Sequence, residues 1–180
     1  MVYRTKTYIA ADWDNDIDAV EQLHEWNDNP YYSKLDFVDV HEFVQARDTS
    51  LYCTIKRSLT ERMKMCNTFI LIVGSKTNSL TKGNCKYCRN YIKYYDYGKC
   101  LSNNHISYKS YIEHECNLAV DSNLNIVVLY NSNIVNKQLC PEVIRQKGVH
   151  VAMKIDGKYN YSKVRDAIIH AKNINYLRSL

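Results

Sequence analysis

The strongest structural signal in the sequence is the stretch Thr68-Phe69-Ile70-Leu71-Ile72-Val73, which is closed by Gly74-Ser75. Its apolar side chains follow one another without the alternation of a half-exposed strand, so a strand buried on both faces is predicted, as in a parallel sheet. The stretch Asn125-Ile126-Val127-Val128-Leu129-Tyr130 repeats the pattern. Together they predict a parallel sheet covered by helices on both of its faces.

Shorter strand and helix signals alternate around these two strands. Strands are predicted at 7–11, 36–40 and 149–153, and helices at about 17–26, 51–66, 108–123 and 161–172. This alternation is typical of a doubly wound α/β domain, because parallel neighbours need right-handed helical crossovers. We therefore predict a flavodoxin-like α/β fold over residues 1–180, with five parallel strands in the order 2-1-3-4-5 and helices on both faces.

Apolar residues at helical spacing predict which side of each helix is buried. The residues expected to face inward are Ile17, Val20, Leu23 and Trp26 in the first helix, Leu51, Ile55, Leu59, Met63 and Cys66 in the second, and Val164, Ile168 and Ile169 in the last. Asp14 or Asp16 is expected to cap the first helix, and the run Asp48-Thr49-Ser50 offers caps for the second.

The positive charge of the chain is concentrated in one segment. Residues 82–110 hold six of the Lys and Arg residues and one acid, Asp96, whereas the rest of the chain has 18 basic and 18 acidic residues. The same segment carries six of the 16 tyrosines and three of the seven cysteines. We predict an insertion over 83–107. Its tyrosines and cations suit a protein partner, and binding of nucleic acid by base stacking is a weaker alternative.

The cysteines and the apolar runs bear on the cellular compartment. Seven cysteines without an export signal indicate reduced thiols, and Cys53, Cys66, Cys116 and Cys140 are expected in the core. No apolar run approaches the roughly 20 residues of a membrane-spanning helix, so a cytoplasmic protein is expected. Cys85 and Cys88 could hold zinc with Cys100 and His105, but a second close pair is lacking, and no metal is expected.

In a doubly wound sheet, the ligand crevice lies at the carboxyl ends of the strands. The loops that follow those strands contain no phosphate-binding G-x-x-x-x-G-K-[ST], no G-x-G-x-x-G and no G-x-S-x-G, which argues against NTPases, dehydrogenases and α/β-hydrolases. The first such loop, Asp12-Trp13-Asp14-Asn15-Asp16, is acidic and would repel the phosphate of a flavin cofactor.

Four stretches resemble the TIR-like domains, most closely the Thoeris antiphage-defence TIR proteins. They are 8–14, 37–50, 55–77 and the helix signal Ser110-Tyr111-Ile112-Glu113-His114-Glu115-Cys116-Asn117-Leu118-Ala119. Members of this family tend to show two aromatic residues, then a glutamate and an alanine four residues on. The residues in those positions here are Tyr111, His114, Glu115 and Ala119. The chain departs from the family in its insertion and in having Tyr and His at the aromatic positions.

The resemblance implies cleavage of the nicotinamide–ribose bond of NAD, with Glu115 as the catalytic residue on the rim of its helix. NAD is expected as substrate, and residues that could line its site are Asp12, Trp13, His41, Arg47, Ser75, Tyr111 and His114. It also implies self-association of TIR domains, a phage protein trigger, and a nucleotide product that activates an effector protein. The alternatives are a non-catalytic TIR-like interaction module and, less strongly, an enzyme that cleaves free nucleosides.

Overall fold

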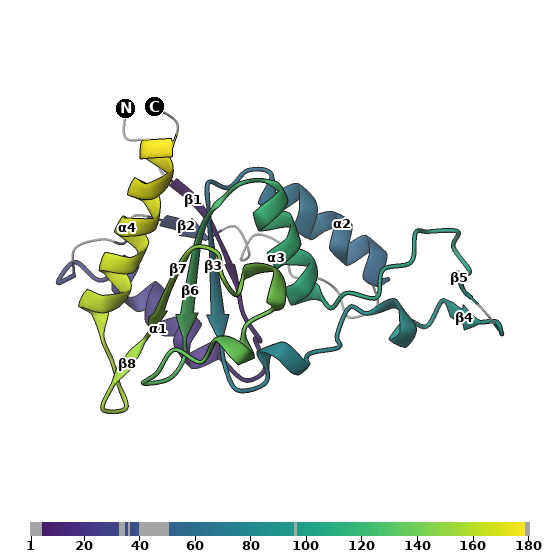
Figure 1. The fold of residues 1–180 in the computed structure, drawn as a ribbon, viewed down its shortest axis with the longest axis horizontal. Helices are drawn as coiled ribbons and strands as arrows, with labels where there is room; N and C mark the ends of the chain where they lie inside the picture. The colour runs from purple at the N-terminus through teal and green to yellow at the C-terminus, as the bar shows by residue number, and fades with distance from the viewer. Residues whose placement is uncertain (1–4, 33–34, 36, 40–50, 96, 179–180) are drawn as a thin grey trace.

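The computed structural model describes residues 5–32, 35, 37–39, 51–95 and 97–178. Its centre is a five-stranded parallel sheet in the order β2-β1-β3-β6-β7 (Figure 1). The strands are β1 (Thr5–Ala10), β2 (Phe37–Asp39), β3 (Thr68–Val73), β6 (Asn125–Tyr130) and β7 (Val149–Ala152). Numbered along the main sheet alone, this is the predicted order 2-1-3-4-5, and the flavodoxin-like α/β class is confirmed.

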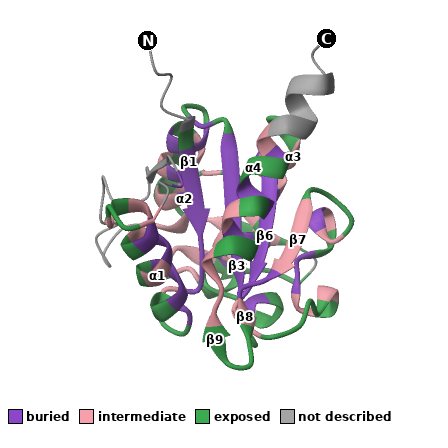
Figure 2. Cartoon of the chain, turned by 90° about the vertical axis from the view of Figure 1, so that its left-hand side faces the viewer, coloured by how far each residue is buried: buried purple, intermediate pink, exposed green. Residues whose placement is uncertain are grey.

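Two pairs of helices cover the two faces of this sheet. Helices α1 (Ile17–Asp28) and α4 (Tyr161–Arg178) pack on one face, and α2 (Tyr52–Met63) and α3 (Tyr111–Asp121) pack on the other. Strand β3 serves both layers, because Ile70 and Ile72 face α1 and α4 while Phe69 and Leu71 face α2 and α3. Figure 2 shows the central strands as the buried part of the molecule. The continuous apolar run is thus explained by burial on both faces.

The helix faces differ from the prediction at a few positions. Ile17 is 39% exposed because it opens α1, and Ile169 is 40% exposed because it lies one helical step from the buried Ile168. Leu51 is the N-cap residue of α2 and is only partly buried. The remaining inward residues are buried or partly buried as predicted, and these are Val20, Leu23, Trp26, Ile55, Leu59, Met63, Cys66, Val164 and Ile168.

The helix ends also differ from the prediction. Asp16 stands at the N-cap of α1 but makes no side-chain capping bond. The suggested caps Asp48, Thr49 and Ser50 lie outside the described residues. Helix α3 is shorter than predicted at both ends, and α4 continues to Arg178 rather than ending near residue 172.

Residues 83–107, called the arm below, lie outside the main sheet. They contain the short 3₁₀ turn η2 (Cys85–Tyr87) and an antiparallel hairpin of β4 (Tyr91–Lys93) and β5 (Gly98–Cys100). In Figure 1 the hairpin projects from the body of the molecule. The root is held to α2 by buried Lys56, whose Nζ donates to Ser107 Oγ at 3.0 Å and to the Lys109 carbonyl at 2.6 Å.

The remaining elements are short. They are the 3₁₀ turns η1 (Thr77–Ser79), η3 (Lys137–Leu139) and η4 (Glu142–Ile144), and the antiparallel pair β8 (Lys154–Ile155) and β9 (Lys158–Tyr159).

Three of the four cysteines expected in the core are buried, and Cys53 is only partly buried. Across the part of the chain that is described, no helix has both the length and the apolar character needed to cross a membrane.

Candidate functional site

Helix α3 sets the position of Glu115. A capping box fixes its first turn: Ser110 Oγ accepts from the Glu113 amide at 3.2 Å, and Glu113 Oε2 accepts from the Ser110 amide at 2.6 Å. From this start, the inward face of α3 carries Ile112, Glu115, Cys116 and Ala119. Glu115 is only 5% exposed. The expectation that it lies on the helix rim is therefore wrong, because this helical phase turns it toward the sheet.

The partner of Glu115 is Tyr8 on β1. The Tyr8 hydroxyl donates to Glu115 Oε1 at 2.5 Å, and both side chains are buried. The sequence reading treated Tyr8 only as a strand residue and missed this contact, which spans 107 positions. A signal was available, since a tyrosine on the buried face of a strand needs a partner for its hydroxyl.

Burial controls the ionisation of Glu115. Desolvation raises the pKa of this carboxyl to about 7, although the Tyr8 hydrogen bond and the positive charge of Arg62 act in the opposite direction. Arg62 lies on α2 and is itself buried. Near neutral pH the side chain can therefore exist as a neutral acid or as a carboxylate, and small changes around it select between the two forms.

The two aromatic neighbours predicted on α3 pack between helices. His114 Nε2 lies 3.2 Å from Thr60 Oγ1 and 3.3 Å from the Lys56 carbonyl, both on α2, and burial lowers the pKa of its imidazole. The ring of Tyr111 meets the ring of Tyr52 edge to face, with 5.7 Å between centroids. Both residues thus join α3 to α2.

The first loop at the carboxyl edge of the sheet is built around its own aspartates. Buried Asp12 accepts from the Asn15 side-chain amide at 2.6 Å and from the Asp14 backbone amide at 3.3 Å. Asp16 accepts from the Asn131 amide at 3.0 Å, and burial raises the pKa of its carboxyl. A side chain at Gly74 would collide with this Asp16 carboxylate, because an added Cβ would stand 2.2 Å from its oxygens.

The predicted site residues divide between two regions. Asp12, Trp13 and Ser75 lie at the carboxyl edge, where Ser75 is exposed and Trp13 packs against the α1 and α4 side of the sheet. Glu115, Tyr111 and His114 lie on the α2 and α3 side. His41 and Arg47 are outside the described residues. Trp13 therefore packs on the other face of the sheet from Tyr111.

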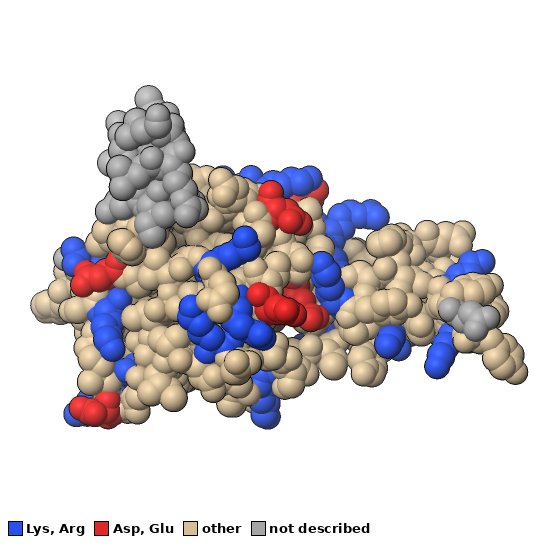
Figure 3. Space-filling model, in the orientation of Figure 1, with Lys and Arg blue, Asp and Glu red and all other residues tan. Residues whose placement is uncertain are grey.

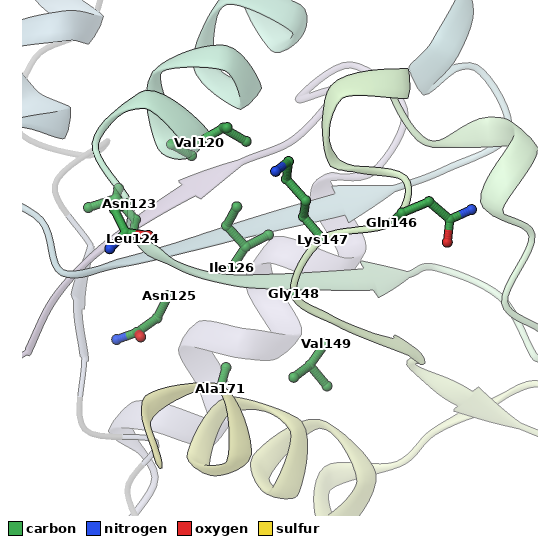
Figure 4. Close-up of a pocket in the computed structure, with 11 residues that line it drawn as sticks. Val120, Asn123, Leu124, Asn125, Ile126, Gln146, Lys147, Gly148, Val149 and Ala171 are labelled. Atoms are coloured by element: carbon green, nitrogen blue, oxygen red, sulfur yellow. The ribbon is translucent and has the colours of Figure 1, made fainter. Parts of the chain in front are cut away.

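A cavity of about 450 Å³ lies at the opposite, amino-terminal edge of the sheet. Figure 4 shows it between the end of α3, the starts of β6 and β7, and α4, with Lys147 and Gln146 on one side and Asn123 and Asn125 on the other. None of the predicted site residues lines this cavity. It is thus distinct from the crevice expected at the carboxyl edge.

The arm contains Cys85, Cys88 and Cys100, the possible zinc ligands of the sequence. In the described part of the chain, no three His, Cys, Asp or Glu side chains gather in a way that could hold a metal ion. Cys85 Sγ instead accepts a hydrogen bond from the Ser107 amide at 3.3 Å, which helps to close the root of the arm.

A five-stranded parallel sheet in this order, with two helices on each face, is the flavodoxin-like α/β architecture, which is the fold class of TIR-like domains. Residues 8–83 match the family model described as "Thoeris protein ThsB, TIR-like domain", so the TIR-like resemblance read from the sequence is confirmed for this part of the chain. The match includes Asp12, Trp13, His41, Arg47 and Ser75. It ends before α3, and therefore before Glu115.

Among solved structures, the chain is similar to one titled "Crystal Structure of a prokaryotic SEFIR domain", with a TM-score of 0.42 and 9% sequence identity. That likeness covers 94% of this chain and 97% of the other. A search of curated proteins found no match.

Proposed function

We propose that this protein is a TIR-like enzyme that cleaves the nicotinamide–ribose bond of NAD, with Glu115 as its catalytic residue. The observation that carries the proposal is the buried Glu115 carboxyl, held by the Tyr8 hydroxyl at 2.5 Å and titrating near pH 7. A desolvated acid with a fixed partner is the kind of group that active sites contain. The match to a Thoeris TIR-like domain supports the same reading.

The chemistry needs one carboxylate. Nicotinamide leaves as a neutral molecule from a ribose that develops positive charge, so a carboxylate beside the sugar stabilises the transition state. No general acid is required, because the departing ring is already cationic in NAD. Water as acceptor gives ADP-ribose, an internal hydroxyl or an adenine nitrogen gives a cyclic product, and an added small molecule gives a conjugate. In antiphage defence, such a nucleotide would activate a partner effector.

The described structure corresponds to a resting state in this proposal. Glu115 is 5% exposed and bonded to Tyr8, so the carboxylate has to be uncovered before it can face a ribose. Asp12, Trp13 and Ser75 at the carboxyl edge would then contribute to NAD binding, together with His41 and Arg47. Turnover is therefore expected to be low in the purified protein and to rise after a phage-derived trigger.

The test is incubation of NAD with the purified wild type and with Glu115→Gln, with and without lysate of phage-infected cells, followed by mass spectrometry of all nucleotides. Glu113→Gln is the matched control, since glutamine keeps the capping box intact. Loss of NAD that depends on Glu115 but not on Glu113 would support the proposal, and the product mass would name the acceptor. Equal turnover in Glu115→Gln and the wild type in the presence of the phage lysate would refute it.

The second candidate function is a non-catalytic interaction module. The observation that favours it is the burial of Glu115, together with an arm whose tyrosines are exposed. Under this reading, changing Tyr87, Tyr95 and Tyr97 to alanine abolishes partner binding, whereas Glu115→Ala leaves binding unchanged. The opposite pattern would exclude the module.

A further inference from the structure

The arm is a cationic and aromatic projection. Four exposed cations lie between its root and tip, Lys86, Arg89, Lys93 and Lys99. In the hairpin, Lys99 pairs with Ile92 and Lys93 pairs with Gly98, so the two lysines stand on opposite faces of the ribbon. Figure 3 shows blue side chains along the arm. The arm is thus positive on both of its faces.

Aromatic rings stand exposed beside these cations. Tyr95 is fully exposed, and Tyr87 and Tyr97 are 63% and 64% exposed. Tyrosine and arginine are enriched at protein interfaces, where a ring supplies contact area at little entropic cost. A projection with this composition is suited to an acidic protein surface.

Such an acidic surface exists on the same chain. Residues 7–33 contain seven acids and no Lys or Arg. Four of these acids, Asp18, Glu21, Glu25 and Asp28, are exposed on α1 at spacings of three, four and three residues. Those spacings align them in one row along the helix, about 15 Å long at 1.5 Å per residue. We call this row the α1 stripe.

The arm and the α1 stripe lie on opposite sides of the sheet. The arm starts from the α2 and α3 side, where Lys56 holds Ser107 and the Tyr111 amide donates to the Lys82 carbonyl at 2.9 Å. Helix α1 packs on the other face with α4. The arm therefore projects away from its own α1 stripe, and a second copy of the chain can present that stripe to it.

We propose that the arm of one copy docks on the α1 stripe of the next copy. This contact joins two different surfaces, so each bound pair keeps one free arm and one free stripe. Such heterologous contacts produce rings or open filaments rather than closed two-fold dimers. The inference goes beyond the proposed enzymatic function and does not depend on it.

The experiment is sedimentation of the full chain in 0.1 M and 1 M NaCl. Screening shortens the reach of charges from about 10 Å to about 3 Å between these conditions. The wild type is expected to sediment as species larger than its 21.1 kDa monomer at 0.1 M NaCl and as the monomer at 1 M. A wild type that stays monomeric at 0.1 M and high protein concentration would overturn the proposal without any variant.

Charge reversal then assigns the surfaces. Lys93→Glu with Lys99→Glu, and separately Glu21→Lys with Glu25→Lys, should each give monomers at 0.1 M NaCl, whereas the control Lys64→Glu with Lys147→Glu should still assemble. An equimolar mixture of the arm and stripe variants should associate again, because each supplies the charge that the other lacks. Assembly that survives either reversal would contradict the contact.

Nucleic acid is the alternative ligand of the arm, and one measurement distinguishes nucleic-acid binding from self-docking. Fluorescence anisotropy with a labelled 20-nucleotide oligouridine should show no binding that depends on Lys93 and Lys99 at 0.1 M NaCl. If the oligonucleotide binds through these lysines while the wild type remains monomeric, the arm is a nucleic-acid platform and the self-docking proposal fails.

Discussion

Replacing Glu115 by glutamine is expected to make the protein more stable at pH 8 and almost equally stable at pH 5. The change keeps the shape of the side chain and removes its charge. In the wild type, burial raises the pKa of Glu115 from 4.5 to about 7 in the folded state. The folded protein therefore holds this proton more tightly than the unfolded chain.

The direction of this stability change follows from the linkage between proton binding and folding. Because the folded pKa exceeds the unfolded one, the stabilisation given by the bound proton is present below about pH 4.5 and is lost as the pH rises through about 7. A difference of about 2.5 pKa units corresponds to about 3 kcal/mol. Glutamine does not titrate, so it avoids this loss, although a weaker hydrogen bond to Tyr8 costs about 1 kcal/mol. The net gain at pH 8 is about 2 kcal/mol.

Urea unfolding of both proteins at pH 5, 6, 7 and 8 measures this directly. The difference in unfolding free energy, variant minus wild type, should rise by about 2 kcal/mol from pH 5 to pH 8. Glu113→Gln is the control and should show no such rise, because Glu113 is exposed in the capping box. A flat difference for Glu115→Gln would refute the argument that Glu115 is buried and titrates near neutral pH.

Further predictions concern the contacts around Glu115 and the arm. The kcat/KM for NAD, which reports ionisation in the free enzyme, should rise with pH through about 7 as Glu115 ionises. Tyr8→Phe should move that midpoint upward, because the hydrogen bond that it removes favours the carboxylate; an unmoved midpoint would contradict this. Lys56→Met removes the hydrogen bonds to Ser107 and Lys109, so the amides at the root of the arm should exchange hydrogen faster while the sheet stays protected. Unchanged exchange would contradict the role of Lys56 in holding the arm to α2. Gly74→Ala should destabilise the fold by about 2 kcal/mol in thermal unfolding, because the added Cβ must displace the Asp16 carboxylate, and an unchanged midpoint would contradict that close approach.

The sheet could be predicted because burial on both faces leaves a mark in the sequence itself. The apolar runs of β3 and β6 have no alternation, and their spacing along the chain leaves room for a helical crossover. Exposure of individual helix residues was less predictable. Ile168 and Ile169 are adjacent isoleucines, and only the phase of α4 against the sheet decides which one is buried.

The environment of Glu115 could not be read from local pattern. The string around it identified the residue, but its burial depends on how α3 packs on β1 and α2. Tyr8 and Arg62, which set its ionisation, are 107 and 53 positions away in the sequence. Long-range packing of this kind leaves only a weak signal in one sequence, here a polar hydroxyl on a strand face that is otherwise apolar.

The place of the arm between β3 and β6 has a consequence for the continuity of the chain. These two strands are direct neighbours in the sheet and pair over all six residues, yet the whole arm separates them in sequence. A cut by trypsin after Lys93 or Lys99, both exposed, would leave one fragment with β1, β2 and β3 and another with β6 and β7. The two fragments would stay joined through the β3–β6 ladder and the cores on both faces. The protein should therefore tolerate being nicked, or produced as two separate polypeptides that reassemble.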